Sequence, residues 1–571
     1  MKRIISVLLA LALLTGICTV AVSAETDGSD LRIAVASDLH YNVPREALAA
    51  PPQGTIDDDI YWYANRRAAM EDESGFIIDA FLKQCAESDI EYILIPGDLA
   101  DNGKTIPQQH IDVAAKFAKF EKETGKQVFV INGNHDFSAW ENETHMEDFK
   151  RIYADFGYNE ALTVDPDSCS YTANLGDKYR LIAVDSCDYS KSTEDGLTLK
   201  RLNFVKRETA NAKKDGRYPI VMMHHNLIDH MPIQRIINRN FIVRFHYSTA
   251  ELFANWGVRV VLTGHEHCSD TAVYTSKAGN KIYDFATTAL TMYPLAYREM
   301  SFTEQAVEYT DVNVQSIDTD ALQAAVSGYS ERQIALMNED LNAYAKGFLK
   351  AGVEFRLWLS LSLEKMGIKE SDFYYGAANA LFGRLNELLK MPLYGENSIQ
   401  TLAEEYNITL PDSDYTTAWD IATEFVAMHY AGEENYGPGS TELTLFMRVV
   451  NLILHDDLAH LSDETLWKGA NKILADTGLT PIASSLNKLG CQIFGSVSAG
   501  EFFLLTLLAP FLYEFVVDTD GVNDNHGSIE GYGVNGSVRN VFADLGSAFS
   551  SILVYIQNFF FILSRVLHIA Y

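Results

Sequence analysis

Short apolar runs alternate with helical patterns along the first half of the chain. The runs that read as buried strands are 31–37, 91–97, 127–133, 179–186, 218–225 and 258–264. The segments between them with helical spacing of apolar residues are 107–125, 145–156 and 197–214. A last group of strand-like runs covers 271–276, 281–286 and 297–303. This order predicts an α/β layered domain with a mostly buried sheet over residues 30–312.

The pattern changes after about residue 315. Long helical patterns then follow one another, as in 330–367, 377–391 and 444–461, and strand-like alternation is scarce. A chain of 571 residues is long enough to form two domains with their own cores. We therefore predict that residues 315–571 form a separate, mostly α-helical C-terminal domain.

Two strongly apolar stretches lie in this second domain. Residues 502–517 include Pro510 and Glu514 and are short for a membrane span, which favours a buried helix. Residues 545–564 carry no charge, yet pairs of polar residues recur there every seven residues. The tail 545–571 is therefore predicted to be an amphipathic helix. It would pack against the domain core or a partner helix, or lie against a membrane, and the sequence leaves these alternatives open.

The N-terminus has the layout of a secretory signal peptide. Lys2 and Arg3 precede an uncharged apolar run, and small residues follow up to Ala24. Cleavage after Ala24 would remove residues 1–24, and the alternative is an uncleaved N-terminal membrane anchor. We expect a secreted or extracytoplasmic protein, with membrane association left open.

The charge of the chain excludes one class of partner. The net charge is −32, and it becomes −34 once Lys2 and Arg3 are removed with the signal peptide. Such a surface repels long polyanions, so a nucleic-acid binder that follows the phosphate backbone is not expected. A small phosphate ester can still reach a metal site, because bound cations reverse the local field.

Cysteine usage indicates a protein that does not depend on disulfides. The cysteines after residue 24 are Cys85, Cys169, Cys187, Cys268 and Cys491. Their odd number and low density exclude a disulfide-framed scaffold. Cys169 and Cys187 flank a predicted hairpin that turns near residues 176–177, and a disulfide between them is left open.

Residues of the kinds that bind metals follow one predicted strand after another. They are Asp38 and His40, Asp98, Asn134 with His135 and Asp136, His224 and His225, and His265 with His267. The carboxyl ends of strands in an open α/β sheet form the crevice where ligands bind. Each motif alone has an ordinary explanation, such as a capped turn or a polar loop. Their joint occurrence at five strand ends predicts a common site.

The residue types fit a pair of metal ions. Two cations about 3.5–4 Å apart need a bridging carboxylate, several neutral imidazoles and further oxygen ligands. Asp98 is the natural bridge, and Asn134 supplies a neutral oxygen. Imidazole and carboxylate together favour iron, manganese or zinc over calcium. A hydroxide held between the two metals would attack a phosphoester.

The motif series "DLH", "GDLADNG", "GNHD", "HH" and "GHEH" resembles the calcineurin-like metallophosphoesterase superfamily, over about residues 31–310. The resemblance implies that Asp38, His40, Asp98 and His267 hold one metal. It implies that Asp98, Asn134, His224 and His265 hold the other. His135 would donate a proton to the leaving group or orient the phosphate, and Asp136 would hold its imidazole in place. His225 and Asn226 would line the pocket.

A finer resemblance concerns the substrate. The stretches "FKRIYADFGYNEAL" and "HHNLIDH", with the secretory start and the helical domain, are similar to secreted class III cyclic-nucleotide phosphodiesterase-like proteins of Gram-positive bacteria. This implies hydrolysis of a phosphodiester, with a cyclic nucleotide as the leading candidate. The alternatives are a metal-dependent phosphomonoesterase or nucleotidase, and a catalytically idle surface-interaction protein.

Residues 41–75 are a candidate loop over the site. Arg66 or Arg67 and Tyr61 to Tyr63 are candidate substrate contacts, and a plain surface insertion is the alternative. The sequence gives no indication of the oligomeric state or of what the helical domain does.

Overall fold

The computed structural model describes most of the first predicted domain and part of the second. The described residues are 30–49, 60–65, 67–139, 143–187, 196–231, 234, 240–360, 370, 375, 379, 383, 387–406, 408–436, 439–456 and 521–533. The predicted signal peptide 1–24, the apolar segment 502–517 and the tail 545–571 lie outside these residues, so their predictions stay predictions.

Two β-sheets form the centre of the N-terminal domain. The six-stranded sheet has the order β13-β12-β11-β1-β2-β3. Its strands are β1 (Leu31–Val35), β2 (Tyr92–Ile95), β3 (Gln127–Val130), β11 (Ala296–Phe302), β12 (Ala306–Asn313) and β13 (His526–Glu530). Strands β1, β2 and β3 run parallel, and β11 pairs antiparallel with β1.

The second sheet has seven strands in the order β4-β5-β6-β7-β8-β10-β9. Its strands are β4 (Thr163–Val164), β5 (Tyr171–Leu175), β6 (Tyr179–Val184), β7 (Tyr218–Met223), β8 (Val260–Thr263), β9 (Asp270–Thr275) and β10 (Lys281–Ala286). Strands β6, β7, β8 and β10 are parallel, whereas β5 and β9 pair antiparallel with their neighbours. The predicted α/β layered domain therefore contains two sheets.

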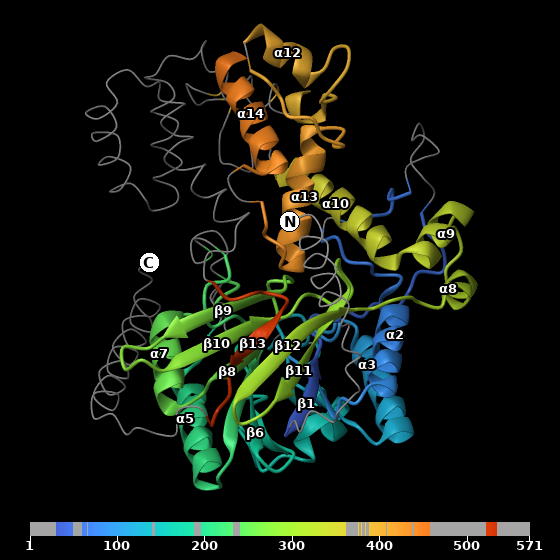
Figure 1. Ribbon diagram of the computed structural model, residues 1–571. Helices are drawn as coiled ribbons and strands as arrows, with labels where there is room; N and C mark the ends of the chain where they lie inside the picture. Colours follow the sequence, from blue (N-terminus) through green and yellow to red (C-terminus); the bar gives the residue numbers. More distant parts are fainter. Residues whose placement is uncertain are drawn as a thin grey trace, which may run out of the picture.

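The sheets pack face to face, with helices on both outer faces (Figure 1). Helices α2 (Ser74–Glu87) and α3 (Pro107–Thr124) lie beside the first sheet, and α5 (Leu199–Lys214) and α7 (His246–Trp256) lie beside the second. The shorter α4 (Met146–Ile152) and the π-helical turn η1 (Ala154–Tyr158) follow β3. One apolar core contains residues of both sheets, and another joins the second sheet to α5 and α7. This confirms the predicted α/β architecture.

Helix α3 shows how the sequence specifies these elements. Pro107 stands in its first turn, where no backbone N–H is required, and Gly125 ends it in the left-handed conformation. Val113, Phe117 and Phe120 form a buried stripe at helical spacing. Each such side chain stabilises the fold by roughly 1.5–3 kcal/mol when it is fully buried.

The chain after residue 315 is mainly helical, as predicted. Its described helices are α8 (Thr319–Ala325), α9 (Glu331–Glu339), α10 (Leu341–Ser360), α12 (Ile399–Glu405), α13 (Ala418–Ala431) and α14 (Thr441–Asp456). A separate apolar cluster, including Ile399, Ile421 and Leu452, packs α12, α13 and α14 together. No helix in the described part of the chain has the length and apolar character needed to cross a bilayer.

The predicted boundary near residue 315 needs one correction, because residues 521–533 return to the first domain. Strand β13 pairs antiparallel with β12 at the edge of the six-stranded sheet. Arg298 is fully buried and donates to Asp311 and to the carbonyl of Asp524. Strand β13 is held in place by these long-range contacts, and no local sequence pattern predicts them.

The predicted hairpin between β5 and β6 is present and turns at Gly176. Cys169 is a buried free thiol, so the disulfide with Cys187 that the sequence left open is not formed. Burial raises the pKa of the Cys169 thiol well above its ordinary value. This thiol therefore packs as a small apolar side chain.

Candidate dinuclear metal centre

The residues that follow five strands meet at one end of the two sheets. Backbone geometry at these positions is unusual, because Asp38, His40, Asp98, His265 and His267 all have positive φ, between 40° and 67°. Such conformations cost non-glycine residues roughly 1–3 kcal/mol and are concentrated at functional sites. A glycine is needed at position 264, because the backbone there passes close to Asp38. A Cβ on Gly264 would lie 2.3 Å from Asp38 Oδ2.

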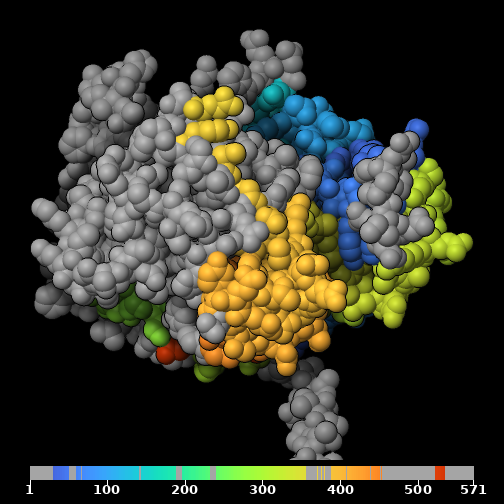
Figure 2. Space-filling view, turned by 90° about the horizontal axis from the view of Figure 1, so that it is seen from above, coloured from blue at the N-terminus to red at the C-terminus, as the bar shows by residue number. Residues whose placement is uncertain are grey.

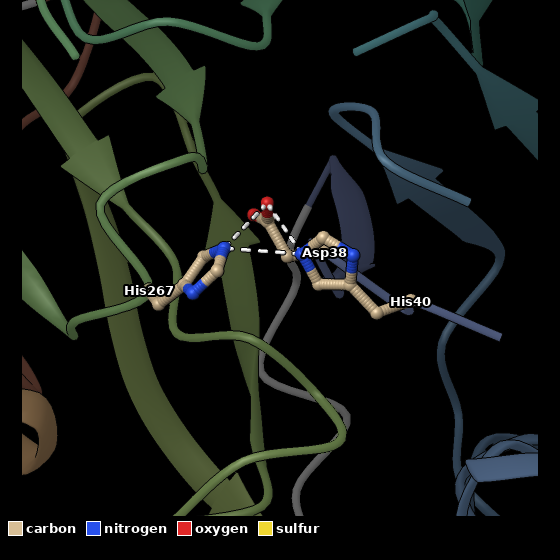
Figure 3. Close-up of side chains that lie close together, drawn as sticks. All are labelled: Asp38, His40 and His267. Atoms are coloured by element: carbon tan, nitrogen blue, oxygen red, sulfur yellow. Dashed lines mark hydrogen bonds and ion pairs between the residues drawn. The ribbon is translucent and has the colours of Figure 1, made fainter. Parts of the chain in front are cut away.

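A first cluster contains Asp38, His40 and His267, whose side chains point toward one another (Figure 3). Asp38 Oδ1 lies 3.3 Å from His267 Nε2 and 3.8 Å from His40 Nε2. The two Nε2 atoms are 3.1 Å apart. Asp38 Oδ2 accepts hydrogen bonds from the Ser37 hydroxyl and the backbone N–H of His265, so the carboxylate is held with Oδ1 toward the imidazoles.

A second cluster is built around His224. Its Nε2 lies 3.4 Å from Asp98 Oδ2, 2.9 Å from Asn134 Oδ1 and 3.0 Å from His265 Nδ1. Its Nδ1 lies 2.9 Å from the carbonyl oxygen of Pro96. Because a carbonyl only accepts, Nδ1 carries the proton there, and Nε2 faces the cluster.

Asp98 connects the two clusters. Its Oδ2 lies 3.4 Å from His224 Nε2 in the second cluster and 3.9 Å from His40 Nε2 in the first. Its Oδ1 accepts the backbone N–H of His135 at 2.7 Å. One oxygen is thus fixed by the main chain, and the other stands between the clusters as a bridging ligand would.

The electrostatics of the site are those of ionised carboxylates among imidazoles. Burial opposes the ionisation of Asp98, but His224 and His135 outweigh it and hold the pKa of Asp98 well below its ordinary value. Burial likewise opposes the charge on His224, yet the Asp98 carboxylate raises its pKa to about 10. Burial lowers the pKa of His40 and of His265, so these two imidazoles are neutral.

These residues fit a pair of metal ions. Asp38 Oδ1 and Asp98 Oδ2 are buried oxygens without a hydrogen-bond partner among the described residues, which is unfavourable unless a cation binds them. The nearby donors are neutral or deprotonatable imidazoles and one amide oxygen, a set that suits iron, manganese or zinc. The predicted ligands are all brought together: Asp38, His40, Asp98, Asn134, His224, His265 and His267.

His135 lies next to the first cluster, with its ring centroid 4.9 Å from that of His40. Its Nδ1 lies 2.8 Å from the backbone carbonyl oxygen of Asp101 and donates to it. Asp136 does not orient this imidazole, contrary to the expectation from the resemblance. The Asp136 carboxylate instead accepts the backbone N–H groups of Gly133 and Ala100, at 2.7 and 3.2 Å. Burial and the Asp98 charge raise the pKa of Asp136 to about 8, and it holds the loop under the site.

Asp101 is a site residue that the sequence reasoning missed. Its Oδ1 lies 3.3 Å from His40 Nδ1, and its Oδ2 accepts Arg67 Nη2 at 2.5 Å. Burial opposes its ionisation, but His40 and Arg67 lower the pKa of Asp101 to about 2. A carboxylate on the far nitrogen of a metal-binding histidine fixes the ring and its tautomer. The signal was its position in "GDLADNG", three residues after Asp98.

Other predicted substrate contacts divide into two groups. Arg67 lies at the site, with its side chain 36% exposed. Tyr63 does not, because it is buried and bonds to Glu73 and Tyr344, each at 2.6 Å. Arg66 lies outside the described residues.

His225 and Asn226 were expected to line the substrate pocket, and this expectation stays a prediction. Both side chains are fully buried. His225 Nδ1 lies 2.8 Å from the Ser186 hydroxyl, and Asn226 donates to Thr263 and to the carbonyl of Gly264. The His225 ring lies beside the second cluster, with its centroid 4.4 Å from that of His265 and 5.0 Å from that of His224.

Comparison with known proteins supports the domain assignment. Residues 31–269 match the family described as "Calcineurin-like phosphoesterase". No curated protein matches the chain.

Several solved structures are similar at low identity. A dimetal phosphatase from Danio rerio has 10% identity and a TM-score of 0.38, and the match covers 50% of this chain and 97% of that one. A purple acid phosphatase from yellow lupin (Lupinus luteus) has 12% identity and a TM-score of 0.32, over 50% and 51%. A predicted phosphoesterase from Streptococcus pneumoniae has 12% identity and a TM-score of 0.22, over 50% and 90%. TM-scores this low carry no argument about the reaction. The family match lies within the N-terminal α/β domain and covers less than half of the chain.

Proposed function

We propose that the protein hydrolyses a small phosphodiester at a dinuclear metal centre. The observation that carries the proposal is the position of Asp98 Oδ2, 3.4 Å from His224 Nε2 and 3.9 Å from His40 Nε2. One carboxylate oxygen shared by two imidazole clusters is the arrangement that a two-metal site requires.

The candidate ligands form two sets, one for each cation. Two bound cations would activate water and offset the charge that develops on the phosphoryl oxygens. Asp38, His40 and His267 would hold one of them, and His224, His265 and Asn134 would hold the other, with Asp98 shared. Asn134 adds no negative charge, so the site keeps surplus positive charge for an anion.

His135 is the residue that we assign to proton transfer. Its Nδ1–H is fixed on the Asp101 carbonyl, which leaves Nε2 for the leaving oxygen of the ester. A main-chain acceptor holds the ring without adding a charge. A group of this kind contributes about 10²–10⁴-fold to the rate.

Local charge favours a diester over a monoester. The guanidinium of Arg67 lies between two carboxylates, 2.5 Å from Asp101 and 3.6 Å from Glu71. A phosphodiester carries one negative charge and so meets less repulsion from these carboxylates than a monoester dianion, whereas the positive charge of two bound metals would attract both esters. Cyclic nucleotides are the leading candidates because of the sequence resemblance, and a nucleotidase is the alternative.

The test compares two esters on the manganese-loaded mature protein. We expect a higher kcat/KM on bis-p-nitrophenyl phosphate than on p-nitrophenyl phosphate, followed by activity on at least one cyclic mononucleotide. Asp98→Asn should abolish both activities, and Asp167→Asn, a matched change in a surface ion pair, should leave them unchanged. A clear preference for the monoester would refute the diester assignment.

Export from the cytoplasm remains a proposal, supported by the layout of residues 1–24. Mass spectrometry of the exported protein should find Glu25 as the first residue. A protein that stays in the cytoplasm with Met1 retained would contradict it.

A further inference from the structure

We propose that helix α10 of the C-terminal domain sets the affinity of the active site for its phosphate ester, because it fixes the backbone turn that carries Arg67. The inference rests on the proposed function and gives the helical domain a role in substrate binding. Gly347 and Gly352 are the positioning residues, and they act through Arg67.

Arg67 is placed to bind an anion beside the metal centre. Its Nη2 is bound to Asp101, whose other oxygen lies 3.3 Å from His40 Nδ1. Asp101 therefore links Arg67 to His40, a predicted metal ligand. A guanidinium has five N–H donors, and its side chain is 36% exposed, so donors remain for a phosphoryl oxygen.

The turn that carries Arg67 is tight and strained. The Asn65 side chain closes it, accepting the backbone N–H of Arg67 at 3.0 Å and donating to the carbonyl of Ala69 at 2.7 Å. Ala68 has a φ of 60°, a conformation that favours glycine. A turn of this kind persists only where its surroundings hold it in place.

Helix α10 supplies that support through close backbone contact. A Cβ at Gly352 would lie 2.5 Å from the Asn65 carbonyl oxygen and 2.8 Å from Ala68 Cβ. One and a half turns earlier, a Cβ at Gly347 would lie 2.1 Å from the Tyr61 hydroxyl. Both glycines face the segment that carries Arg67. A larger residue at Gly352 must push the backbone of that segment, whereas one at Gly347 must displace the Tyr61 ring.

Buried hydrogen bonds lock the rest of the segment to the same part of the helical domain. The Tyr63 hydroxyl bonds to Glu73 and to Tyr344 of α10, each at 2.6 Å. Tyr329, just before α9, donates to the same Glu73 oxygen at 2.6 Å. In the view from above, blue residues of the N-terminal part border the lime residues of α8 and α9 (Figure 2).

The helical domain also contacts the chain just beyond His267. Lys346 of α10 pairs with Glu424 of α13 at 2.6 Å. The carbonyl of Tyr430, also in α13, accepts the backbone N–H of Ser269 at 3.0 Å. Ser269 is two residues beyond His267, so α13 links α10 to the catalytic domain near the first cluster.

The experiment inserts one methyl group at this contact. Gly352→Ala is compared with Gly383→Ala, where the structure shows no atom within 4 Å of the added Cβ. We expect Gly352→Ala to raise KM for bis-p-nitrophenyl phosphate and Kd for inorganic phosphate about tenfold, the size of a lost charge-assisted contact. Its kcat should stay within about threefold, because uniform binding is lost. Manganese content should equal that of the wild type, and Gly383→Ala should match the wild type throughout.

Gly347→Ala, which presses on Tyr61, is the second variant and decides the matter if Gly352→Ala does not fold. A folded variant with unchanged KM and unchanged phosphate Kd would overturn the inference. So would a loss of manganese or of kcat at unchanged KM, since the helix would then support the metal centre itself. A wild type that binds phosphate but hydrolyses no phosphoester would refute the proposed function, and the phosphate Kd comparison would still test the helix.

Discussion

Asp101→Asn separates two roles that meet in one residue. The Asp101 side chain contacts His40 and Arg67, whereas its backbone carbonyl accepts Nδ1 of His135. The substitution keeps size and main chain, so the His135 hydrogen bond remains. Only the charge beside His40 and Arg67 is removed.

The pKa of Asp101 indicates how strongly His40 and Arg67 stabilise its ionised carboxylate. Burial alone would raise it, yet His40 and Arg67 bring it from 3.8 to about 2 in the metal-free protein. Each pKa unit corresponds to about 1.4 kcal/mol, so the ionised side chain is favoured by roughly 2 kcal/mol. Because the folded pKa is depressed, this stabilisation is present above pH 3.8 and is lost as the pH falls toward 2. A carboxylate behind a metal-binding histidine is usually worth about 10–100-fold in metal affinity.

The assay is competition for manganese between a chelator of known affinity and the apo-protein. We expect Asp101→Asn to weaken binding of one manganese ion about 30-fold and to leave the other within about threefold. At saturating manganese, kcat should fall much less than in His135→Ala. Asp167→Asn is the control, because Asp167 is 57% exposed and pairs with the exposed Lys200. Two unchanged manganese affinities in Asp101→Asn would refute the reasoning.

Three further predictions concern catalysis, stability and pH. His135→Ala should keep both metals but lose about 10²–10⁴-fold in kcat, and a loss below tenfold would remove it from proton transfer. Arg298→Ala should lower the free energy of unfolding in urea by about 3–5 kcal/mol, because it removes a fully buried guanidinium from the Asp311 carboxylate, which is 13% exposed, and from the Asp524 carbonyl. Arg151→Ala, in an exposed pair, should cost no more than about 1 kcal/mol. Burial raises the pKa of Glu73 above its ordinary value of 4.5. The contribution of Glu73 to the free energy of unfolding is therefore present below pH 4.5 and is lost as the pH rises. Glu73→Gln should therefore gain in Tm relative to the wild type between pH 4.5 and neutrality, and parallel Tm curves would contradict this.

The sequence was enough to predict the strand ends and the candidate ligands that meet there. Side chains such as Asp38 and His267 follow buried strands directly, so the order of strands determines where they meet. Strand β12 was missed although its residues alternate between buried and exposed, a signal that was present in "AVEYTDVN". Strand β13 has no such signal, because only one of its five residues is buried. Its strand conformation depends on pairing with β12.

The contacts behind the ligands could not be read from the sequence. His135 is oriented by a backbone carbonyl, and every residue carries one, so residue types could not distinguish Asp101 from Asp136. The surroundings of His225 and Asn226 also come from the fold alone. Both are polar residues at a strand end, and only the fold shows that they are buried and that the His225 ring lies against that of His265.

The most direct test of the dinuclear centre is anomalous diffraction from a crystal of the manganese-loaded protein. The account predicts two peaks about 3.5–4 Å apart on either side of Asp98, one beside His40 and His267 and one beside His224 and His265. A folded protein with no anomalous density at Asp98, or with a single ion there under saturating manganese, would contradict it.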